Sequence, residues 1–376
     1  KEEGRIKAIV VTGCLAERYQ QEIAKELPEV NAVVGIGANK DIARIVREAL
    51  EGKRIETFPP KCELPLEGER VQSTPSYFSY LKIAEGCDNH CTYCAIPLIR
   101  GGYRSRKMED ILAEAEKLAQ WGVKELMVIA QDTTRYGEDL YGEGKLPQLL
   151  TELCKVERLR WIRVLYCYPE RITDELLEVM AKEDKILKYM DLPLQHCSRQ
   201  VLRAMNRQGD RESLSALIRK IREKVPGIVL RTTFMVGFPG ETEEAFEELA
   251  EFAKEMRFER MGCFAYSQEE GTPAARLPDQ ISREIKEHRQ ELMMEQQMAL
   301  MDEMSREMVG KTITVLNEGW DRYAECCFGR SAADAPEIDT KVFFTVEGTK
   351  PYPGMFVQVE ITDTMDCDLI GQVVTT

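Results

Sequence analysis

Three cysteines, Cys87, Cys91 and Cys94, stand in a C-x3-C-x2-C spacing directly after the apolar run 80–84. Three closely spaced thiolates can bind three irons of a cubic iron–sulfur cluster. The fourth iron then has no protein ligand and is free to bind a small molecule, whereas clusters that only carry electrons normally have four cysteine ligands. The spacing therefore predicts a cluster that takes part in chemistry.

Three other roles are possible for these cysteines. A structural zinc ion takes four ligands, commonly as two separated pairs, but this stretch offers three cysteines with His90 between two of them. A disulfide framework is typical of small secreted domains, and the chain shows no secretory signal. Burial as small apolar side chains does not fit the polar neighbours Asp88, Asn89 and His90, which indicate a loop. The iron–sulfur interpretation is therefore preferred.

The composition is that of an acidic soluble protein with more than one domain. The chain has 376 residues, more than one core usually serves, and a formal net charge of −14. No apolar run approaches the ~20 residues that a membrane-spanning helix needs. Twelve cysteines without a secretory signal favour a reducing compartment, the cytoplasm. The chain begins with Lys1 and soon enters a strand-like run, so we expect that its first part is missing.

Residues 1–55 are predicted to form part of an α/β domain, with two buried strands that are each followed by a helix. The strands are 6–13 and 30–36, and the helices extend to Leu27 and over 40–50. Cys14 follows the first strand, where the ligand residues of open α/β sheets gather, although a lone cysteine there is more often structural. The proline-containing residues 56–76 are predicted to be a linker.

Strands and helices alternate from 77 to 280, a pattern that gives a parallel sheet with right-handed crossovers. The predicted strands are 80–84, 124–130, 161–167, 188–192, 228–236 and 260–266. The predicted helices are 107–120, 145–157, 173–183, 198–224 and 242–256. Six such units make an open (β/α)6 partial TIM barrel, whose chemistry should lie at the carboxyl ends of the strands.

Polar or glycine-rich groups follow all six predicted strands. Solvation of loops explains polarity in general, but it does not explain why these groups all fall on one side of the sheet. We therefore expect one shared site there. Besides the three cysteines, its candidate residues are Gln131, Asp132, Gln195, Gly237, Gly240 and Glu241.

Residues 281–309 are predicted to be a connecting helix, and residues 310–376 a small antiparallel β-barrel. Its strands are predicted at Thr312–Leu316, Arg322–Cys326, Lys341–Val346, Phe356–Ile361 and Asp368–Val374. The segment 310–376 has five lysines and arginines against eleven aspartates and glutamates, hence a net charge of −6. Such a surface repels a phosphate backbone and attracts a basic protein. We expect a basic protein partner and no direct RNA binding.

Beyond these patterns, the cysteine stretch resembles the radical S-adenosylmethionine (SAM) methylthiotransferases, and the resemblance extends over the whole chain. The motifs that carry it are Lys82–Pro97 with Arg100-Gly101 and Arg104–Arg106, Val11–Tyr19, Asp191–Gln195, Arg231–Glu241 and Tyr266–Pro273. The family has an amino-terminal cluster domain, a radical SAM partial barrel and a small carboxyl-terminal barrel called TRAM. The predicted order of elements matches it.

The family has two main branches, one that modifies an adenosine in transfer RNA and one that modifies an aspartate of ribosomal protein uS12. The motifs resemble those of the ribosomal-protein branch: Glu85–Gly101, Asp191–His196, Tyr266–Thr272 and Asp366–Gly371. The acidic final barrel agrees with this branch, because ribosomal proteins are basic. The transfer-RNA branch and a non-catalytic iron–sulfur protein for electron transfer stay open as alternatives.

The resemblance implies two 4Fe–4S clusters and SAM. Cys87, Cys91 and Cys94 would bind one cluster, whose open iron chelates SAM. The second cluster has three cysteine ligands in this family. Cys14 matches the third of them, and the first two would precede Lys1. Electron transfer from a donor such as flavodoxin or ferredoxin would cleave the sulfonium. The resulting 5′-deoxyadenosyl radical would take a hydrogen from the β-carbon of the aspartate. A second SAM would supply the methyl group. Candidates for holding SAM, by their position, are Gln131, Asp132, Gln195, Gly237, Gly240 and Glu241.

Overall fold

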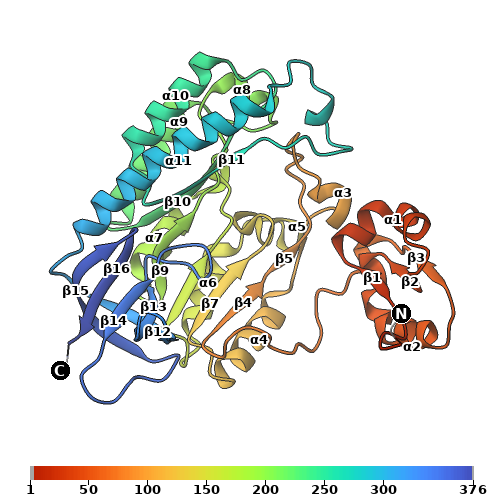
Figure 1. The fold of residues 1–376 in the computed structure, drawn as a ribbon, viewed down its shortest axis with the longest axis horizontal. Helices are drawn as coiled ribbons and strands as arrows, with labels where there is room; N and C mark the ends of the chain where they lie inside the picture. The colour runs from red at the N-terminus through yellow and green to blue at the C-terminus, as the bar shows by residue number, and fades with distance from the viewer. Residues whose placement is uncertain (1–3, 375–376) are drawn as a thin grey trace.

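In the computed structural model, which describes residues 4–374, a small amino-terminal sheet, a central half-barrel and a carboxyl-terminal β-barrel follow one another along the chain (Figure 1). The amino-terminal unit lies at one side of the half-barrel and the carboxyl-terminal barrel at the other. The amino-terminal unit and the carboxyl-terminal barrel therefore lie apart from one another.

The amino-terminal unit is a parallel sheet in the order β1-β2-β3. Its elements are β1 (Val10–Thr12), α1 (Cys14–Glu26), β2 (Ala32–Val34), the 3-10 turn η1 (Ile36–Asp41), α2 (Ile42–Leu50), β3 (Ile55–Thr57) and the 3-10 turn η2 (Lys61–Glu63). The strand β3, which the sequence pattern did not predict, pairs with β2. Buried Ala32, Ile45 and Ala49 join the sheet to α2.

The central unit is a six-stranded parallel sheet in the order β11-β10-β9-β8-β7-β4, so the predicted open (β/α)6 half-barrel is confirmed. Its strands are β4 (Phe78–Lys82), β7 (Glu125–Ile129), β8 (Trp161–Val164), β9 (Ile186–Asp191), β10 (Val229–Val236) and β11 (Arg260–Ala265). A short antiparallel pair, β5 (Ala84–Glu85) and β6 (Arg104–Ser105), flanks the cysteine loop.

Helices cover the convex face of this sheet, where Val128, Leu230 and Phe234 are fully buried. The α-helices are α3 (Ile96–Arg100), α4 (Met108–Gln120), α5 (Glu138–Tyr141), α6 (Leu146–Cys154), α7 (Asp174–Lys182), α8 (Arg199–Ala204), α9 (Arg211–Lys224), α10 (Glu243–Met256) and α11 (Arg283–Arg306). The 3-10 turns are η3 (Thr133–Arg135), η4 (Pro169–Arg171) and η5 (Ala274–Arg276). The alternation of strands and helices along the chain predicted this arrangement.

The stretch 198–224 is two helices, so the prediction of one continuous helix was wrong. Asn206 (φ 57°) and Gly209 (φ 105°) have left-handed backbone conformations, which an α-helix does not allow. Asp210 then begins α9 with a capping box, because its carboxylate accepts from the Ser213 N–H while the Ser213 hydroxyl accepts from the Asp210 N–H. The turn between α8 and α9 therefore points the side chains of residues 206–209 in directions that one continuous helix would not allow.

The carboxyl-terminal unit is a closed barrel in the order β12-β13-β14-β16-β15. Its strands are β12 (Thr312–Asp321), β13 (Cys326–Ser331), β14 (Val342–Thr345), β15 (Phe356–Met365) and β16 (Asp368–Val373). The predicted barrel is confirmed, although β14 and β16 pair in parallel. The predicted strand 322–326 was wrong, because the Asp321 carboxylate accepts from the N–H groups of Tyr323 and Ala324 and turns the chain there.

The loop between β13 and β14, residues 332–341 (the insertion loop), packs into the concave face of the half-barrel. Ala335 in this loop is fully buried and belongs to one apolar cluster with Met127, Leu187 and Tyr189 of the half-barrel strands. The Trp161 ring meets the Phe356 ring of β15 edge-on, with the ring centres 4.7 Å apart. The two units therefore share an apolar core.

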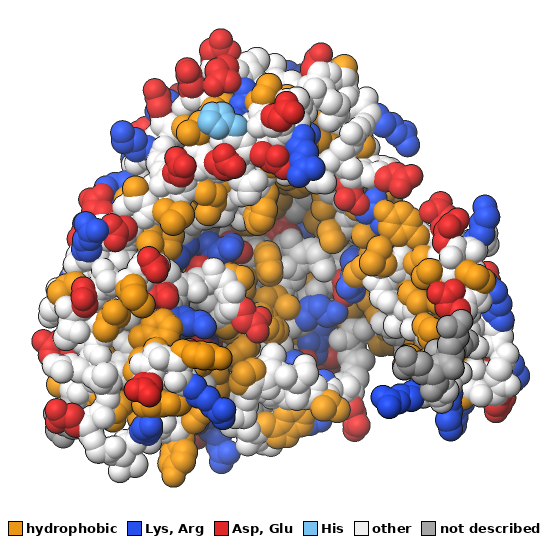
Figure 2. All heavy atoms as spheres, viewed as in Figure 1, with side chains coloured by type: hydrophobic (Ala, Val, Ile, Leu, Met, Phe, Trp, Pro, Cys, Tyr) orange, Lys and Arg blue, Asp and Glu red, His pale blue; other side chains and the backbone are white. Residues whose placement is uncertain are grey.

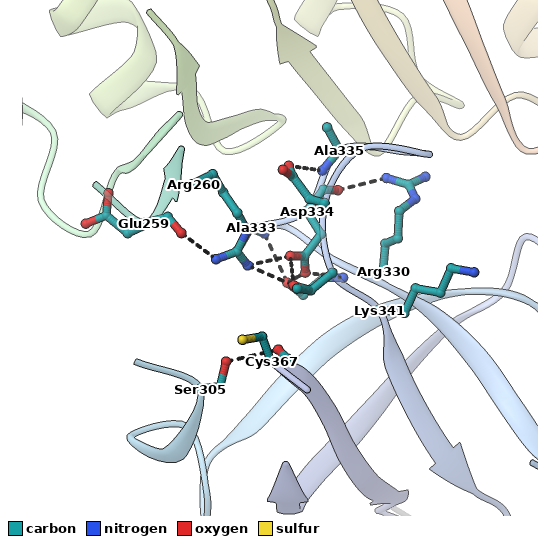
Figure 3. Close-up of polar contacts among 12 residues, drawn as sticks. Glu259, Arg260, Ser305, Arg330, Ala333, Asp334, Ala335, Lys341 and Cys367 are labelled. Atoms are coloured by element: carbon teal, nitrogen blue, oxygen red, sulfur yellow. Dashed lines mark hydrogen bonds and ion pairs between the residues drawn. The ribbon is translucent and has the colours of Figure 1, made fainter. Parts of the chain in front are cut away.

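Buried ion pairs reinforce the same contact. The Glu125 carboxylate at the start of β7 accepts from Arg163 of β8 (2.9 Å) and from Arg330 of β13 (2.7 Å), and all three side chains are buried. Arg260 of β11 pairs with Asp334 of the insertion loop at 2.5 Å (Figure 3). Nearby, the Ser305 hydroxyl at the end of α11 donates to the Cys367 carbonyl (Figure 3).

The helices described within residues 4–374 include none with the length and apolar character to cross a membrane.

Candidate active site

A cavity of about 440 Å³, here called the cluster cavity, lies at the carboxyl ends of the half-barrel strands β4, β7, β8 and β9. Its position agrees with the rule that parallel α/β barrels place their sites at these strand ends. The space-filling view shows the molecule hollowed at the centre of its concave face (Figure 2). The cavity is lined by Lys82, Cys87, Asn89, Cys91, Tyr93, Cys94, Ile96, Ile129, Ala130, Gln131, Tyr166, Cys167, Tyr168, Pro193, Gln195 and Arg207.

The loop that carries the three cysteines begins at Gly86, directly after β5. Gly86 has φ 81°, and a Cβ there would overlap the Gly102 carbonyl oxygen, so the close approach of the two segments requires glycine. The Cys87 N–H donates to the Gly101 carbonyl (3.1 Å). The Cys94 N–H donates to the Cys91 carbonyl (3.0 Å), which turns both side chains toward the same cavity.

Hydrogen-bond partners lie beside two of the three sulfurs. The Ile96 N–H points at the Cys94 sulfur (3.4 Å), and the Tyr168 hydroxyl lies 3.5 Å from the Cys91 sulfur. Such hydrogen bonds to sulfur are among the factors that set the potential of an iron–sulfur cluster.

Burial raises the pKa of the Cys87 thiol to about 11, and it raises the pKa of the Cys94 thiol as well. These thiols are therefore neutral at pH 7 without metal, and binding of iron deprotonates them. Because all three cysteines line one cavity, the residues present fit an iron–sulfur cluster with three cysteine ligands.

Two predicted glutamines reach the cluster cavity. The Gln131 amide nitrogen lies 3.3 Å from the Glu85 carboxylate, while its buried carbonyl oxygen has no hydrogen-bond partner among the described residues. Gln195 has a left-handed backbone (φ 70°) held by hydrogen bonds of its N–H and C=O with Thr233 and Met235 of β10. Both glutamines can therefore offer polar groups to a bound molecule.

Comparison with known proteins places this geometry in a family. Residues 81–253 match the radical SAM superfamily and residues 309–374 match the TRAM domain. The protein of Desulforamulus reducens described as "Ribosomal protein uS12 methylthiotransferase RimO" is 48% identical over 99% of this chain and 84% of its own length. The protein of the same description from Pelotomaculum thermopropionicum is 50% identical over 100% of this chain and 84% of its own length.

The chain belongs to the RimO family of radical SAM methylthiotransferases. A solved structure, the radical SAM methyltransferase TsrM from Kitasatospora setae, shares the fold with a TM-score of 0.55 at 16% identity, covering 71% of this chain and 58% of that one. Because both relatives are described as methylthiotransferases of ribosomal protein uS12, the prediction of the ribosomal-protein branch is confirmed over the transfer-RNA branch. Membership of the superfamily also implies a 4Fe–4S cluster and SAM.

In this RimO-family chain, Asp132 is fully buried and does not line the cluster cavity. Its carboxylate accepts from the Asn89 amide (2.9 Å) and the Thr134 hydroxyl (2.6 Å), and its carbonyl accepts from the Tyr103 hydroxyl (2.9 Å). Asn89 lies between two of the cysteines. Asp132 therefore holds the cysteine loop in place, and a direct contact of Asp132 with SAM stays a prediction.

Gly237, Gly240 and Glu241 also lie outside the lining of the cluster cavity. The buried Glu241 carboxylate accepts from the Gly237 N–H (2.9 Å) and from Arg289 of α11 (2.7 Å). A Cβ at Gly237 would overlap the Lys286 side chain. This loop leads from β10 to α10 and is held against α11 by the ion pair with Arg289. It does not line the cluster cavity, and its contact with SAM stays a prediction.

Cys14 is an exposed thiol at the start of α1, and it does not line the cluster cavity. Arg100, at the end of α3, donates to the Cys14 sulfur at 3.0 Å. Since α3 begins two residues after Cys94, Cys14 faces the segment that carries the other cysteines. The structure thus brings Cys14 to the edge of the same region of the RimO-family fold.

Tyr168 and Arg207 are among the residues of the cavity wall that sequence reasoning did not single out. Tyr168 follows β8, and its residue type alone gives it no role. Arg207 lies in the turn between α8 and α9, inside a stretch predicted as one helix, so no pattern in the sequence could bring it to the site.

Proposed function

We propose that this protein transfers a methylthio group to the β-carbon of an aspartate in ribosomal protein uS12. Two observations support the proposal together: the identity of 48–50% to RimO proteins over nearly the whole chain, and the three cysteine sulfurs that line the cavity of the half-barrel. The relatives are named for uS12, a ribosomal protein, and such proteins are basic. The acidic net charge of −14 suits a basic partner.

Cys87, Cys91 and Cys94 are proposed to bind three irons of the central 4Fe–4S cluster. When bound, the cluster and SAM supply one-electron cleavage of the sulfonium and the abstraction of a hydrogen atom. The Ile96 N–H and the Tyr168 hydroxyl stabilise negative charge on the sulfurs of Cys94 and Cys91. Gln131 and Gln195 are proposed to bind polar groups of SAM, and the apolar walls Ile129 and Ala130 exclude water from the reacting atoms.

Cys14 is proposed as one ligand of a second 4Fe–4S cluster, which would carry the sulfur. Its sulfur lies at the amino-terminal end of a helix and accepts a hydrogen bond from Arg100. Replacing Cys14 with Ala in a longer chain that binds both clusters should lower the iron content by about four per chain, the content of one cube. Unchanged iron would show that Cys14 is structural.

The partners proposed besides uS12 are a small electron-transfer protein, flavodoxin or ferredoxin, and the compartment is the cytoplasm. Direct binding of RNA is not expected. Binding of ribosomal RNA or transfer RNA whose affinity falls steeply with added salt would contradict this, because such a slope counts phosphate contacts.

The decisive experiment uses the protein with reconstituted clusters, SAM, a reductant and purified uS12 under anaerobic conditions. Mass spectrometry should find one methylthio group in place of one hydrogen on a single aspartate. Cys91→Ala should lose the absorbance of the central cluster and form no 5′-deoxyadenosine, while Cys62→Ala, an exposed cysteine away from the cavity, is the matched control. Modification of transfer RNA instead of uS12 would overturn the proposal.

A further inference from the structure

Arg207 is a buried arginine whose hydrogen bonds are incomplete. Its side chain is 3% exposed and lies over the Tyr168 ring, 4.0 Å from the ring centre. One terminal nitrogen donates to the Pro193 carbonyl (3.0 Å), and the other lies 3.5 Å from the Tyr93 hydroxyl. The buried Nε forms an ion pair with the Glu170 carboxylate at 3.8 Å but has no hydrogen-bond partner within residues 4–374. A buried donor of this kind is costly unless a ligand completes it.

Arg207 stands in the wall between two cavities. One is the cluster cavity, and the other, here called the arginine cavity, also has about 440 Å³ and is lined by Arg171, Arg203 and Arg207 together with polar groups. Asn89 and Tyr168 line both cavities as well. A molecule in the arginine cavity therefore lies directly beside the position of the cysteines.

The charge of the arginine cavity suits an anion. Its three arginines face two carboxylates, Asp88 and Glu170. Arg171 pairs with Glu138 (2.5 Å) and with Asp132 (3.5 Å), whereas Arg203 is exposed and forms no ion pair within residues 4–374. Guanidinium groups match the planar fork of a carboxylate. In a protein of net charge −14, a positive cavity beside the catalytic cysteines is a local exception.

The reaction offers a carboxylate at the required place. The carbon from which hydrogen is removed in the proposed function is the β-carbon of an aspartate, one bond from the carboxylate carbon. A carboxylate held in the wall between the two cavities therefore keeps its β-carbon at the edge of the cluster cavity. An acidic enzyme surface attracts the basic protein as a whole, but it does not select one acidic side chain within that protein. A buried arginine can make this selection, because it binds one carboxylate directly.

We propose that Arg207, with Arg203 at the mouth of the arginine cavity, binds the side-chain carboxylate of the target aspartate and so determines specificity. This inference rests on the proposed function. SAM also carries a carboxylate, and the experiment must separate the two sources.

The test compares Arg207→Met and Arg207→Lys with wild type, each with reconstituted clusters. The substrates are a uS12 peptide that contains the target aspartate and the same peptide with asparagine, which is neutral and of equal size. Methylthio transfer gives KM and kcat, and equilibrium dialysis gives the Kd of SAM. Arg207→Met should raise KM for the aspartate peptide by about tenfold or more, the worth of a charged hydrogen bond. Arg207→Lys should recover part of it, and the Kd of SAM should stay within about twofold.

Arg203→Gln tests the same proposal with an exposed residue, in case Arg207→Met fails to fold. It should raise KM for the aspartate peptide by about threefold, in the range of a partly exposed charge contact. Arg219→Gln, an exposed arginine on α9 far from the cavity, is its matched control and should leave KM unchanged.

Three results would overturn the inference, and they are distinguishable. A raised Kd of SAM with unchanged KM for peptide would assign Arg207 to the carboxylate of SAM. Unchanged KM for both Arg207→Met and Arg203→Gln, or equal use of the aspartate and asparagine peptides by wild type, would show that the arginines do not read the carboxylate. If wild type modifies neither the peptide nor intact uS12, the proposed function itself fails.

Discussion

Replacing Arg330 with Met should uncouple the carboxyl-terminal barrel from the half-barrel. Arg330 is 2% exposed and donates to Glu125 (2.7 Å), to Glu318 (2.8 Å) and to the Asp334 carbonyl (3.0 Å). Methionine keeps most of the apolar stem but removes the charge, so Glu125 is left with Arg163 as its one buried ion partner. Removing one partner of a buried pair costs about 3–5 kcal/mol, and the remaining partner places this case near the lower limit, about 3 kcal/mol.

The measurement is the free energy of unfolding in denaturant, followed by tryptophan fluorescence. Trp161 is buried against Phe356 of the carboxyl-terminal barrel, so its emission reports this interface, while Trp121 and Trp320 are largely exposed. Arg306→Met is the matched control, because Arg306 pairs with Asp302 on the surface, where such pairs contribute about 1 kcal/mol or less.

A loss below about 1 kcal/mol for Arg330→Met, with unchanged Trp161 emission, would refute the reasoning, because it would mean that the buried pair contributes no more than an exposed one. A double variant with Glu125→Gln adds a second check. Its cost should be smaller than the two single costs together by about 1–3 kcal/mol, since the carboxylate and the guanidinium interact directly.

Three further outcomes follow from the same structure. Burial alone raises the pKa of Glu125, but Arg330 and Arg163 outweigh it and hold that pKa below its ordinary value of 4.5. The stability that Glu125 contributes is therefore complete above pH 4.5 and is lost as the pH falls below it. When the free energy of unfolding is measured against pH, Glu125→Gln should lose less stability in acid than wild type. Gly86→Ala should abolish the absorbance of the central cluster, whereas Gly122→Ala, with a similar φ but open space, should leave it intact and cost about 1 kcal/mol of stability. Asp210→Ala should destabilise the protein by about 1 kcal/mol through loss of the α9 cap, seen as a lower unfolding midpoint.

The half-barrel could be predicted from the sequence because its physical cause is local. A run such as Glu125–Ile129, followed by polar residues and an amphipathic helix, repeats along the core, and the period of each element decides its type. The break between α8 and α9 was missed because Asn206 can adopt a left-handed conformation but does not have to. The strand β3 was missed because three residues are too short to show a period.

The contact between the two large units could not be predicted, because it depends on pairs far apart in sequence. Arg163 stands in an apolar strand, and its charge has no local explanation; its partners are Glu125 on the next strand and the Ala332 carbonyl of the insertion loop. The three cysteines were found because a ligand set within eight residues is itself a local pattern. Arg207 was missed because only the folded turn brings it to the cavity.

The insertion loop limits how this protein could have been assembled from parts. A half-barrel with six strands leaves its concave side open. Here the neighbouring barrel covers that side near the amino-terminal ends of the strands, where its residues Asp334 and Ala335 are buried. A recombination event that exchanged the last domain for another of the same fold would expose Trp161, and it would leave Glu125 without Arg330 and Arg163 without the Ala332 carbonyl. We therefore expect the two domains to evolve together. Substitutions at Arg330 and Glu125 should preserve stability only when they occur together.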